Sequence, residues 1–270
     1  MNLYVYCPRR STGALELVKA MGAHRLRKFD GLNFWNKRTR VKLSPNDIVV
    51  CWGSAVPEID EVRVLNASDK SVTKYDEIYT LAQAGVPTIA YSKGGRNKYS
   101  GDAVFLPRIN FHQEGRDLIY PPERPDFYTI KENFVKEYRI HSFDGRSIRA
   151  GVKVPREGFK ATTEANWKPN SGLLHPWIRS YDCGWKINYD GFQSTAKLRK
   201  VAHTAVAALG LTFGAVDIGE LPDGTLKVLE VNRAPGIEGG SIQTYVRAIT
   251  RWIEGRKEKK NDAGGAGAGV

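Results

Sequence analysis

The stretch GAVDIGELPDGTLKVLEVNRAPG, residues 214–236, carries most of the information about how this sequence folds. Two apolar-rich segments flank Pro222–Gly224, a turn sequence that favours a β-hairpin. Asp217 lies in the first segment, and Glu230 and Asn232 end the second. Because residues two apart in a strand point to the same face, Glu230 and Asn232 share a face, and a tight hairpin brings Asp217 beside them. Three oxygen-bearing side chains are therefore expected together on one sheet face.

Such a set of oxygen ligands suits Mg²⁺, which prefers a few carboxylates together with phosphate oxygens and water. Polar side chains between apolar strand residues are unfavourable unless something charged faces them. The alternative interpretation is a surface salt bridge, in which Glu230 and Asn232 end a strand beside Arg233. Spacing alone does not separate these two interpretations.

A second charged cluster lies in the segment FYTIKENFVKEYRIHSFDGRSIRAGVKV, residues 127–154, which alternates as two strands around an Asp-Gly turn. Glu137 and Arg139 share a face of the first strand, and Arg149 and Lys153 lie on the return strand. Cations on such a face can neutralise a phosphate during phosphoryl transfer. Cross-strand ion pairs on a solvated sheet are the alternative.

Two glycine-containing loops could also contact an anion. The loop at 93–101 carries Arg96 and Lys98 and could close over a triphosphate, although it lacks the Gly-Lys-Ser/Thr of a P-loop. The loop APGIEGGS, residues 234–241, leads into a helix, whose first N–H groups attract anions. A plain surface loop and a helix capped by Ser241 are the respective alternatives.

The rest of the chain alternates between strands and helices, which is typical of an α/β protein. A strand, a helix and a second strand at 2–6, 14–23 and 47–54 predict a parallel sheet near the N-terminus. Further helices are expected at 75–85, 194–210 and 241–254, and further strands at 86–92 and 103–109. Residues 155–192 give no clear prediction.

Composition narrows the class of protein. The 270 residues are 41% hydrophobic and 26% charged, as in a soluble globular protein, and no apolar run approaches a membrane span. The N-terminus lacks a signal-peptide layout, and three scattered cysteines indicate reduced thiols in the cytoplasm. The net charge of +12 suits a nucleotide, a nucleic acid or an acidic polypeptide, but no basic-aromatic nucleic-acid module stands out.

Taken together, these motifs resemble the ATP-grasp superfamily of carboxylate–amine ligases over about residues 1–255. Asp217 followed by LEVNRAPG, residues 229–236, is similar to that family's metal signature, in which Asp, Glu and Asn hold the Mg²⁺ ions that bridge ATP phosphates. EYRIH, residues 137–141, followed by Phe-Asp-Gly, resembles the alpha-L-glutamate-ligase branch, in which the Arg serves the transferred phosphate. Asp217, Glu230 and Asn232 are thus implied as metal ligands.

Other motifs extend the resemblance. Trp177–Arg179 with Gly184-Trp185 resembles small ATP-grasp proteins of tailed phages, and it implies that Arg179 joins Arg139 at the reacting phosphate and acyl phosphate. The family's usual nucleotide-binding lysine is not identifiable, and most relatives carry Thr where Arg233 stands. The residues expected at the nucleotide are Arg96, Lys98, Lys131, Glu137 and Lys153.

The resemblance implies an α/β (α+β) ATP-grasp fold: an N-terminal parallel α/β domain followed by two α+β subdomains that clamp ATP. The expected boundaries are an N-terminal pre-ATP-grasp domain at 1–66, a central nucleotide-clamping subdomain at 67–135 and a C-terminal subdomain with the metal site at 136–255, followed by a disordered tail at 256–270.

The implied function is an ATP- and Mg²⁺-dependent ligase that joins a carboxylate to an amine through an acyl phosphate, without a protein nucleophile. An acidic peptide, a free amino acid and a modified nucleotide each fit as the substrate drawn to a positive cleft, and the oligomeric state stays open. The alternative is a catalytically weak nucleotide-binding accessory protein that acts with nucleic acid or an assembly. A cytoplasmic location is expected, which would be the host cytoplasm for a phage protein.

Overall fold

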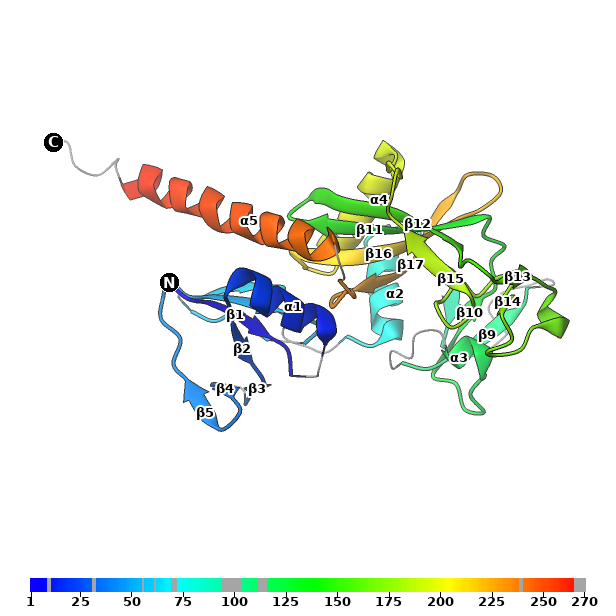
Figure 1. The fold of residues 1–270 in the computed structure, drawn as a ribbon, viewed down its shortest axis with the longest axis horizontal. Coiled ribbons are helices and arrows are strands. Elements are labelled where there is room, and N and C mark those ends of the chain that lie inside the picture. The colour runs from blue at the N-terminus through cyan, green and yellow to red at the C-terminus, as the bar shows by residue number, and fades with distance from the viewer. Residues whose placement is uncertain are drawn as a thin grey trace.

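The computed structural model describes residues 1–8, 11–30, 33–54, 56–60, 62–68, 72–93, 103–110, 116–237 and 240–264. Arg96 and Lys98, and with them the glycine loop that carries these cations, lie outside the described residues. The described chain forms a four-stranded parallel sheet, a two-stranded parallel sheet and three antiparallel sheets, with a long helix, α5, packed beside the four-stranded parallel sheet (Figure 1).

The N-terminal part contains the predicted parallel sheet, with strand order β2-β1-β6-β7. Its strands are β1 (Leu3–Tyr6), β2 (His24–Leu26), β6 (Ile48–Cys51) and β7 (Arg63–Leu65). Helix α1 (Thr12–Met21) connects β1 to β2. It begins where the Ser11 side chain accepts a hydrogen bond from the Ala14 amide, and it ends at Gly22, whose φ of 60° suits a residue without a Cβ. The expected strand–helix–strand order is confirmed.

A small antiparallel sheet, β3-β4-β5, lies between β2 and β6 in the sequence, where no element was predicted. Its strands are β3 (Lys28–Phe29), β4 (Phe34–Asn36) and β5 (Thr39–Val41). Phe29, Phe34 and Val41 pack against Tyr6 and Leu26 of the parallel sheet. Two or three residues per strand are too few for a periodic pattern to be recognised in the sequence.

The central part contains helix α2 (Lys74–Gln83) and the three-stranded sheet β8-β10-β9. The strands are β8 (Tyr91–Ser92), β9 (Phe105–Arg108) and β10 (Phe127–Ile130), with a short helix, α3 (Arg116–Ile119). Helix α2 begins close to the expected start at residue 75, after a capping box formed by Thr73 and Asp76. The strand expected at 86–92 is shorter, and Thr88 instead bridges to Val228.

The C-terminal part is built on an antiparallel five-stranded sheet, β15-β12-β11-β16-β17, which contains both predicted hairpins. The strands are β11 (Lys136–Phe143), β12 (Arg146–Pro155), β15 (Trp185–Asn188), β16 (Phe213–Glu220) and β17 (Leu226–Asn232). Helix α4 (Ala196–Ala208) covers one face, where Ile140, Val216 and Ile218 pack against Leu198 and Ala202.

The segment without a clear prediction forms short elements before β15: β13 (Lys160–Ala161), the 3-10 helix η2 (Glu164–Asn166) and β14 (Leu173–Leu174). Helix α5 (Gly240–Gly264) continues past the expected end at Glu254, so the expected tail begins inside it; side chains after Gly255 are not described. None of the helices in the described part of the chain combines the length and the apolar character needed to cross a bilayer.

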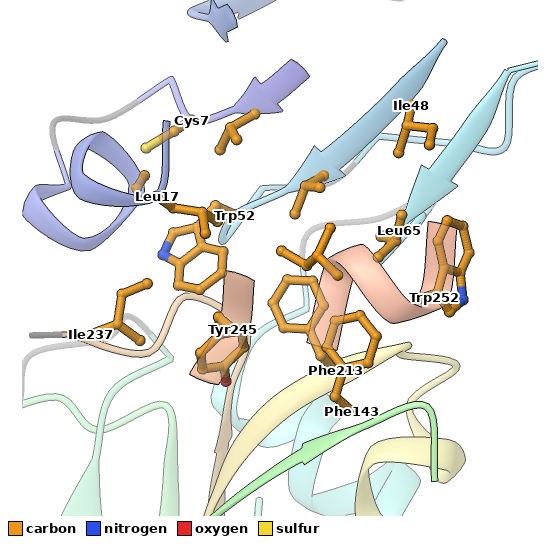
Figure 2. Packing of buried hydrophobic residues seen from close by; sticks show 14 of the residues in the cluster. Cys7, Leu17, Ile48, Trp52, Leu65, Phe143, Phe213, Ile237, Tyr245 and Trp252 are labelled. Atoms are coloured by element: carbon orange, nitrogen blue, oxygen red, sulfur yellow. The ribbon is translucent and has the colours of Figure 1, made fainter. Parts of the chain in front are cut away.

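One hydrophobic core joins the N-terminal sheet, α5 and one end of the five-stranded sheet (Figure 2). The Trp52 ring lies 5.3 Å from the rings of both Phe213 and Tyr245, and Phe143 stacks on Phe213 with a centroid distance of 5.8 Å. Aromatic groups dominate because they bury a large area with defined ring geometry. The N-terminal sheet is therefore held against the sheet that carries Asp217.

Asn66 adds a polar link at the same junction, directly after β7. Its side-chain oxygen accepts hydrogen bonds from the amides of Thr212 (2.8 Å) and Phe213 (2.9 Å), and its amide nitrogen donates to the Phe213 carbonyl (3.0 Å). The residue is buried and has a φ of 58°, a conformation that asparagine tolerates better than most side chains.

We expect Asn66→Ala to lower the free energy of unfolding by about 2–4 kcal/mol, because it leaves two buried amide donors without an acceptor. The matched control is Asn170→Ala, since Asn170 has a φ of 60° but is exposed, so it changes the backbone preference alone. Urea denaturation measures both variants. Equal losses would show that Asn66 acts only through its backbone conformation.

Candidate active site

The five-stranded sheet has one apolar and one charged face. Arg139 of β11 is paired with Asp217 of β16, which is paired with Glu230 of β17, and Asn232 is paired with Ala215 two positions away. Because side chains two apart share a face, these four residues lie on the side opposite the α4 core. The hairpin therefore has the predicted geometry.

The strongest interaction on this face is the ion pair between Arg139 and Asp217. The Arg139 Nε lies 2.6 Å from Asp217 Oδ1, and Nη2 lies 2.7 Å from Oδ2, so the contact is bidentate. Burial alone would raise the pKa of Asp217, but the nearby cations of Arg139 and Lys153 lower it to about 2. Burial would lower the pKa of Arg139, and Asp217 more than offsets this effect. Both groups therefore stay charged.

Lys153 and Glu137 extend this pair into a chain of charges across the sheet. The Lys153 ammonium lies 3.6 Å from Asp217 Oδ2 and 2.8 Å from Glu137 Oε2. The Arg179 guanidinium follows, 4.0 Å from Glu137 Oε1, and donates to the Phe134 carbonyl at 2.8 Å. Five of the predicted site residues thus form one continuous ionic network, with Arg139 and Arg179 at opposite ends.

Glu230 and Asn232 flank the network without joining it. Within the described residues, the Glu230 carboxylate takes part in no hydrogen bond or ion pair, and the Asn232 Oδ1 accepts only the Ala234 amide, at 3.0 Å. No cluster of three or more His, Cys, Asp or Glu side chains that could hold a metal occurs in the described chain.

This donor set nevertheless fits a magnesium ion that shares its coordination with phosphate oxygens and water. An ionised carboxylate has about four lone-pair positions, so Asp217 can accept from Arg139 and Lys153 and still face a cation. Glu230 offers a carboxylate with no other partner in the described chain, and Asn232 offers an amide oxygen with a remaining lone pair. Their roles as ligands stay predictions.

Lys131, a predicted nucleotide contact, is not part of this network. Its ammonium lies 2.8 Å from the Glu164 carboxylate and 4.3 Å from the centre of the Trp177 ring. These partners belong to the segment between β12 and β15, whose elements were not predicted from the sequence. A nucleotide would have to compete with both contacts for this lysine.

A second group of charged residues near the site was not predicted. Arg108 of β9 and Lys74 of α2 both approach the buried Asp117 carboxylate, at 2.8 Å and 3.8 Å. Burial and the neighbouring Arg108 lower the pKa of Lys74, while Asp117 and Glu230 oppose that shift. Lys74 is thus close enough to Asp117 and Glu230 for each carboxylate to influence its pKa. A cation in the first turn of a helix opposes the helix dipole. This unfavourable position was the signal in the sequence that could have pointed to Lys74.

Glu77, one turn after Lys74 in α2, has a buried carboxyl group that contacts β17 next to Glu230. Its Oε1 accepts a hydrogen bond from the Val231 amide at 2.8 Å. Burial raises the pKa of Glu77 to about 8, with a further contribution from Glu230. At neutral pH Glu77 is therefore mostly protonated, and it holds the strand next to Glu230 without adding a second full negative charge.

His141 lies on the charged face and is a buried polar residue whose two ring nitrogens both have partners. Its two ring nitrogens lie 3.1 Å and 3.0 Å from the hydroxyls of Tyr245 and Tyr189. Burial lowers the pKa of His141 to about 3, so the ring stays neutral in the physiological range. Arg149, the neighbour across the strands, lies over the Tyr189 ring at 4.0 Å.

Solved structures with a similar arrangement of elements identify the fold class of this chain. The ATP-grasp ligase PsnB, solved with a precursor variant, Mg and ADP, aligns over 92% of this chain and 99% of its own, with a TM-score of 0.56 and 12% identity. D-alanine–D-alanine ligase from Bacillus anthracis aligns over 96% and 99%, with a TM-score of 0.56 and 13% identity. The chain therefore has the ATP-grasp fold, as the sequence motifs predict.

Within this fold, part of the sequence is similar to a narrower group. A probable alpha-L-glutamate ligase 1 from Shewanella oneidensis is 35% identical over 131 residues, which are 47% of this chain and 39% of that protein. The chain thus matches well under half the length of this relative. No family model matches the chain. The expected likeness to the alpha-L-glutamate-ligase branch is confirmed over this stretch, and the likeness to phage proteins stays a prediction.

The raised pKa of Glu77 predicts how stability depends on pH in the metal-free protein. The pKa rises from 4.5 to about 8 on folding, so in this interval the folded state keeps a proton that the unfolded state releases. Stability should therefore fall as pH rises, by roughly 1 kcal/mol per unit. Glu77→Gln keeps an acceptor for Val231 and cannot titrate, so its advantage over wild type should grow from pH 5 to pH 8.5.

Urea denaturation in EDTA at several pH values measures this difference. Glu16→Gln, the same change at an exposed position of α1, is the control and should leave the pH dependence unchanged. A constant difference between Glu77→Gln and wild type across this range would contradict the assignment of a protonated Glu77.

Proposed function

We propose that this chain is a Mg²⁺- and ATP-dependent ligase, which joins a carboxylate to an amine through an acyl phosphate. The observation that carries the proposal is the charged sheet face on an ATP-grasp fold, where the Arg139–Asp217 pair lies beside the two oxygen donors Glu230 and Asn232. Such a face suits a ligand with both a cation and phosphates, because it presents positive and negative groups side by side.

Asp217, Glu230 and Asn232 would hold the metal. When bound, Mg²⁺ would neutralise charge on the phosphate oxygens and orient them for attack by the substrate carboxylate. The low pKa of Asp217 keeps this ligand ionised at any working pH, so no proton has to leave before binding.

Arg139 and Arg179 would bind the transferred phosphate and the acyl phosphate. Arg139 is held in one orientation by Asp217, and Arg179 by Glu137, the Phe134 carbonyl and the Trp185 ring at 5.0 Å. Groups fixed before the reaction need little rearrangement when charge develops, which is how such contacts favour the transition state. Lys153 lies between Glu137 and Asp217, and its ion pairs with both connect the Arg139 end of the network to the Arg179 end.

The chemistry does not require a nucleophilic side chain, and the cysteines agree with this. Cys7, Cys51 and Cys183 are all buried free thiols. Burial raises the pKa of each, to about 12 for Cys51, so the reactive thiolate is scarce at neutral pH. His141 is neutral and held by two tyrosine hydroxyls, so it is not a general base in this proposal.

The names of the relatives suggest which substrates to test first. Because the sequence relative is a probable alpha-L-glutamate ligase, glutamate is the first amine to test. Because PsnB was also solved with a precursor peptide, peptide carboxylates are the first acids to test. An acidic peptide would also suit a chain of net charge +12.

We expect the purified chain with Mg-ATP to form ADP and phosphate faster when both an acid and an amine are present, together with an amide product detected by mass spectrometry. Glu230→Gln should lower this rate about 100-fold or more, because one metal-facing carboxylate is lost. Glu16→Gln is the matched control and should retain wild-type turnover.

Three other outcomes would contradict the proposal. If no acid and amine pair raises turnover and Glu230→Gln equals wild type, the ligase function is wrong. Mg-ATP binding without turnover would favour the accessory protein instead. A stable phosphorylated product, in place of an amide and free phosphate, would indicate a kinase-like transfer.

A further inference from the structure

The small sheet β3-β4-β5 and its turns carry a concentration of exposed positive charge. Between residues 27 and 42 the sequence contains six lysines and arginines, against a single acid, Asp30. All six cations are exposed: Arg27, Lys28, Lys37, Arg38, Arg40 and Lys42. In the part of the chain that the structure describes, none of the six forms a salt bridge with a carboxylate. Their charge is therefore available to a partner.

The strand register sorts this sheet into two faces. Phe34 pairs with Phe29 on one side and Val41 on the other, and this apolar row packs on the parallel sheet. Trp35 pairs with Lys28 and Arg40, so these three residues form the next row, on the opposite face. An aromatic ring thus lies between two cations, with about 4.8 Å between neighbouring strands.

The local hydrogen bonds fix this arrangement. The Trp35 indole N–H donates to Asp30 Oδ2 at 2.8 Å, and Asp30 Oδ1 accepts the Asn33 amide at 2.7 Å. Asp30 therefore orients the tryptophan ring. Lys37 has a φ of 58° in the tight turn between β4 and β5, and this turn carries Lys37 and Arg38 at its tip.

This face is separate from the candidate active site. Figure 1 shows β3, β4 and β5 at the outer edge of the N-terminal part, on the far side of the parallel sheet from the five-stranded sheet. None of the residues proposed to hold Mg-ATP belongs to this sheet. The six cations thus form a surface that the ligase function does not use.

We propose that the outward face of β3-β4-β5 binds single-stranded nucleic acid, with a base stacked on Trp35 and phosphates on Lys28, Arg40 and the cations of the turn. Stacking on an aromatic ring between cations is how proteins bind single strands without sequence preference. An acidic peptide could pair with the cations but would leave the aromatic ring unused. A single strand therefore fits the row of Lys28, Trp35 and Arg40 better than an acidic peptide does. This binding needs neither the Mg-ATP site nor catalysis.

The first test uses fluorescence anisotropy of a fluorescein-labelled oligothymidine of about 15 nucleotides, long enough for one binding site. The variant Lys28→Gln/Arg38→Gln/Arg40→Gln should bind at least about tenfold more weakly than wild type. Its log-affinity against log-salt slope should be smaller by about 2, because three phosphate contacts to a single strand are lost. The control, Lys160→Gln/Lys186→Gln/Lys200→Gln, removes the same charge from exposed positions elsewhere and should change the affinity less than about threefold.

The second test separates stacking from charge. Trp35→Leu should weaken binding about fivefold or more with an unchanged salt slope, since a base loses its aromatic partner but no phosphate contact is lost. Circular dichroism checks that this variant is folded. In the Mg-ATP turnover assay every one of these variants should equal wild type, so a failed ligase assay and a failed binding assay remain distinguishable.

Three results would overturn the proposal. One is wild-type protein that does not bind the oligonucleotide at low salt. Another is an equal loss in both triple variants, which would attribute binding to net charge alone. The third is a polyglutamate peptide that competes as strongly as an unlabelled oligonucleotide while folded Trp35→Leu binds like wild type, which would assign the surface to acidic polypeptides.

Discussion

The buried ion pair between Arg139 and Asp217 is the constraint around which the C-terminal part is organised. Two charges removed from water are unfavourable unless their geometry is good and further partners satisfy them. The bidentate contact and the Lys153 and Glu137 charges beside it meet this requirement. The charged face can be kept because the opposite face is mostly apolar and packs on α4. A sheet with two such different faces is suited to holding a charged ligand on one side.

The network is stable only if the sheet that carries it is held rigidly. The core around Trp52, Phe213 and Tyr245 attaches one end of the sheet to the N-terminal part, and Asn66 adds directional hydrogen bonds there. Tyr245 links this core to the site, since its hydroxyl contacts His141. His141, two residues from Arg139, thus connects the charged face to this core.

How much could be predicted from the sequence depended on how local each signal was. The two hairpins follow from alternation and turn residues within a short window, so the pairing of Asp217 with Glu230 was predictable. The contacts of Lys131 could not be predicted, because its partners, Glu164 and Trp177, come from a segment without periodicity. The Lys74, Arg108 and Asp117 cluster joins three elements that only tertiary structure brings together.

The distribution of charge along the chain distinguishes the proposed Mg-ATP site from the proposed nucleic-acid surface, which net charge alone does not. On and beside the charged sheet face, the four cations Arg139, Arg149, Lys153 and Arg179 are nearly balanced by Glu137, Asp217 and Glu230, so this set of residues adds only one charge to the total of +12. Residues 27–42, by contrast, have six cations against one acid, an excess of five. A nucleotide site that carries its own counter-charges does not account for that excess. Five of the twelve net positive charges thus lie in the segment where Trp35 stands between cations, and this position argues for a second anionic partner.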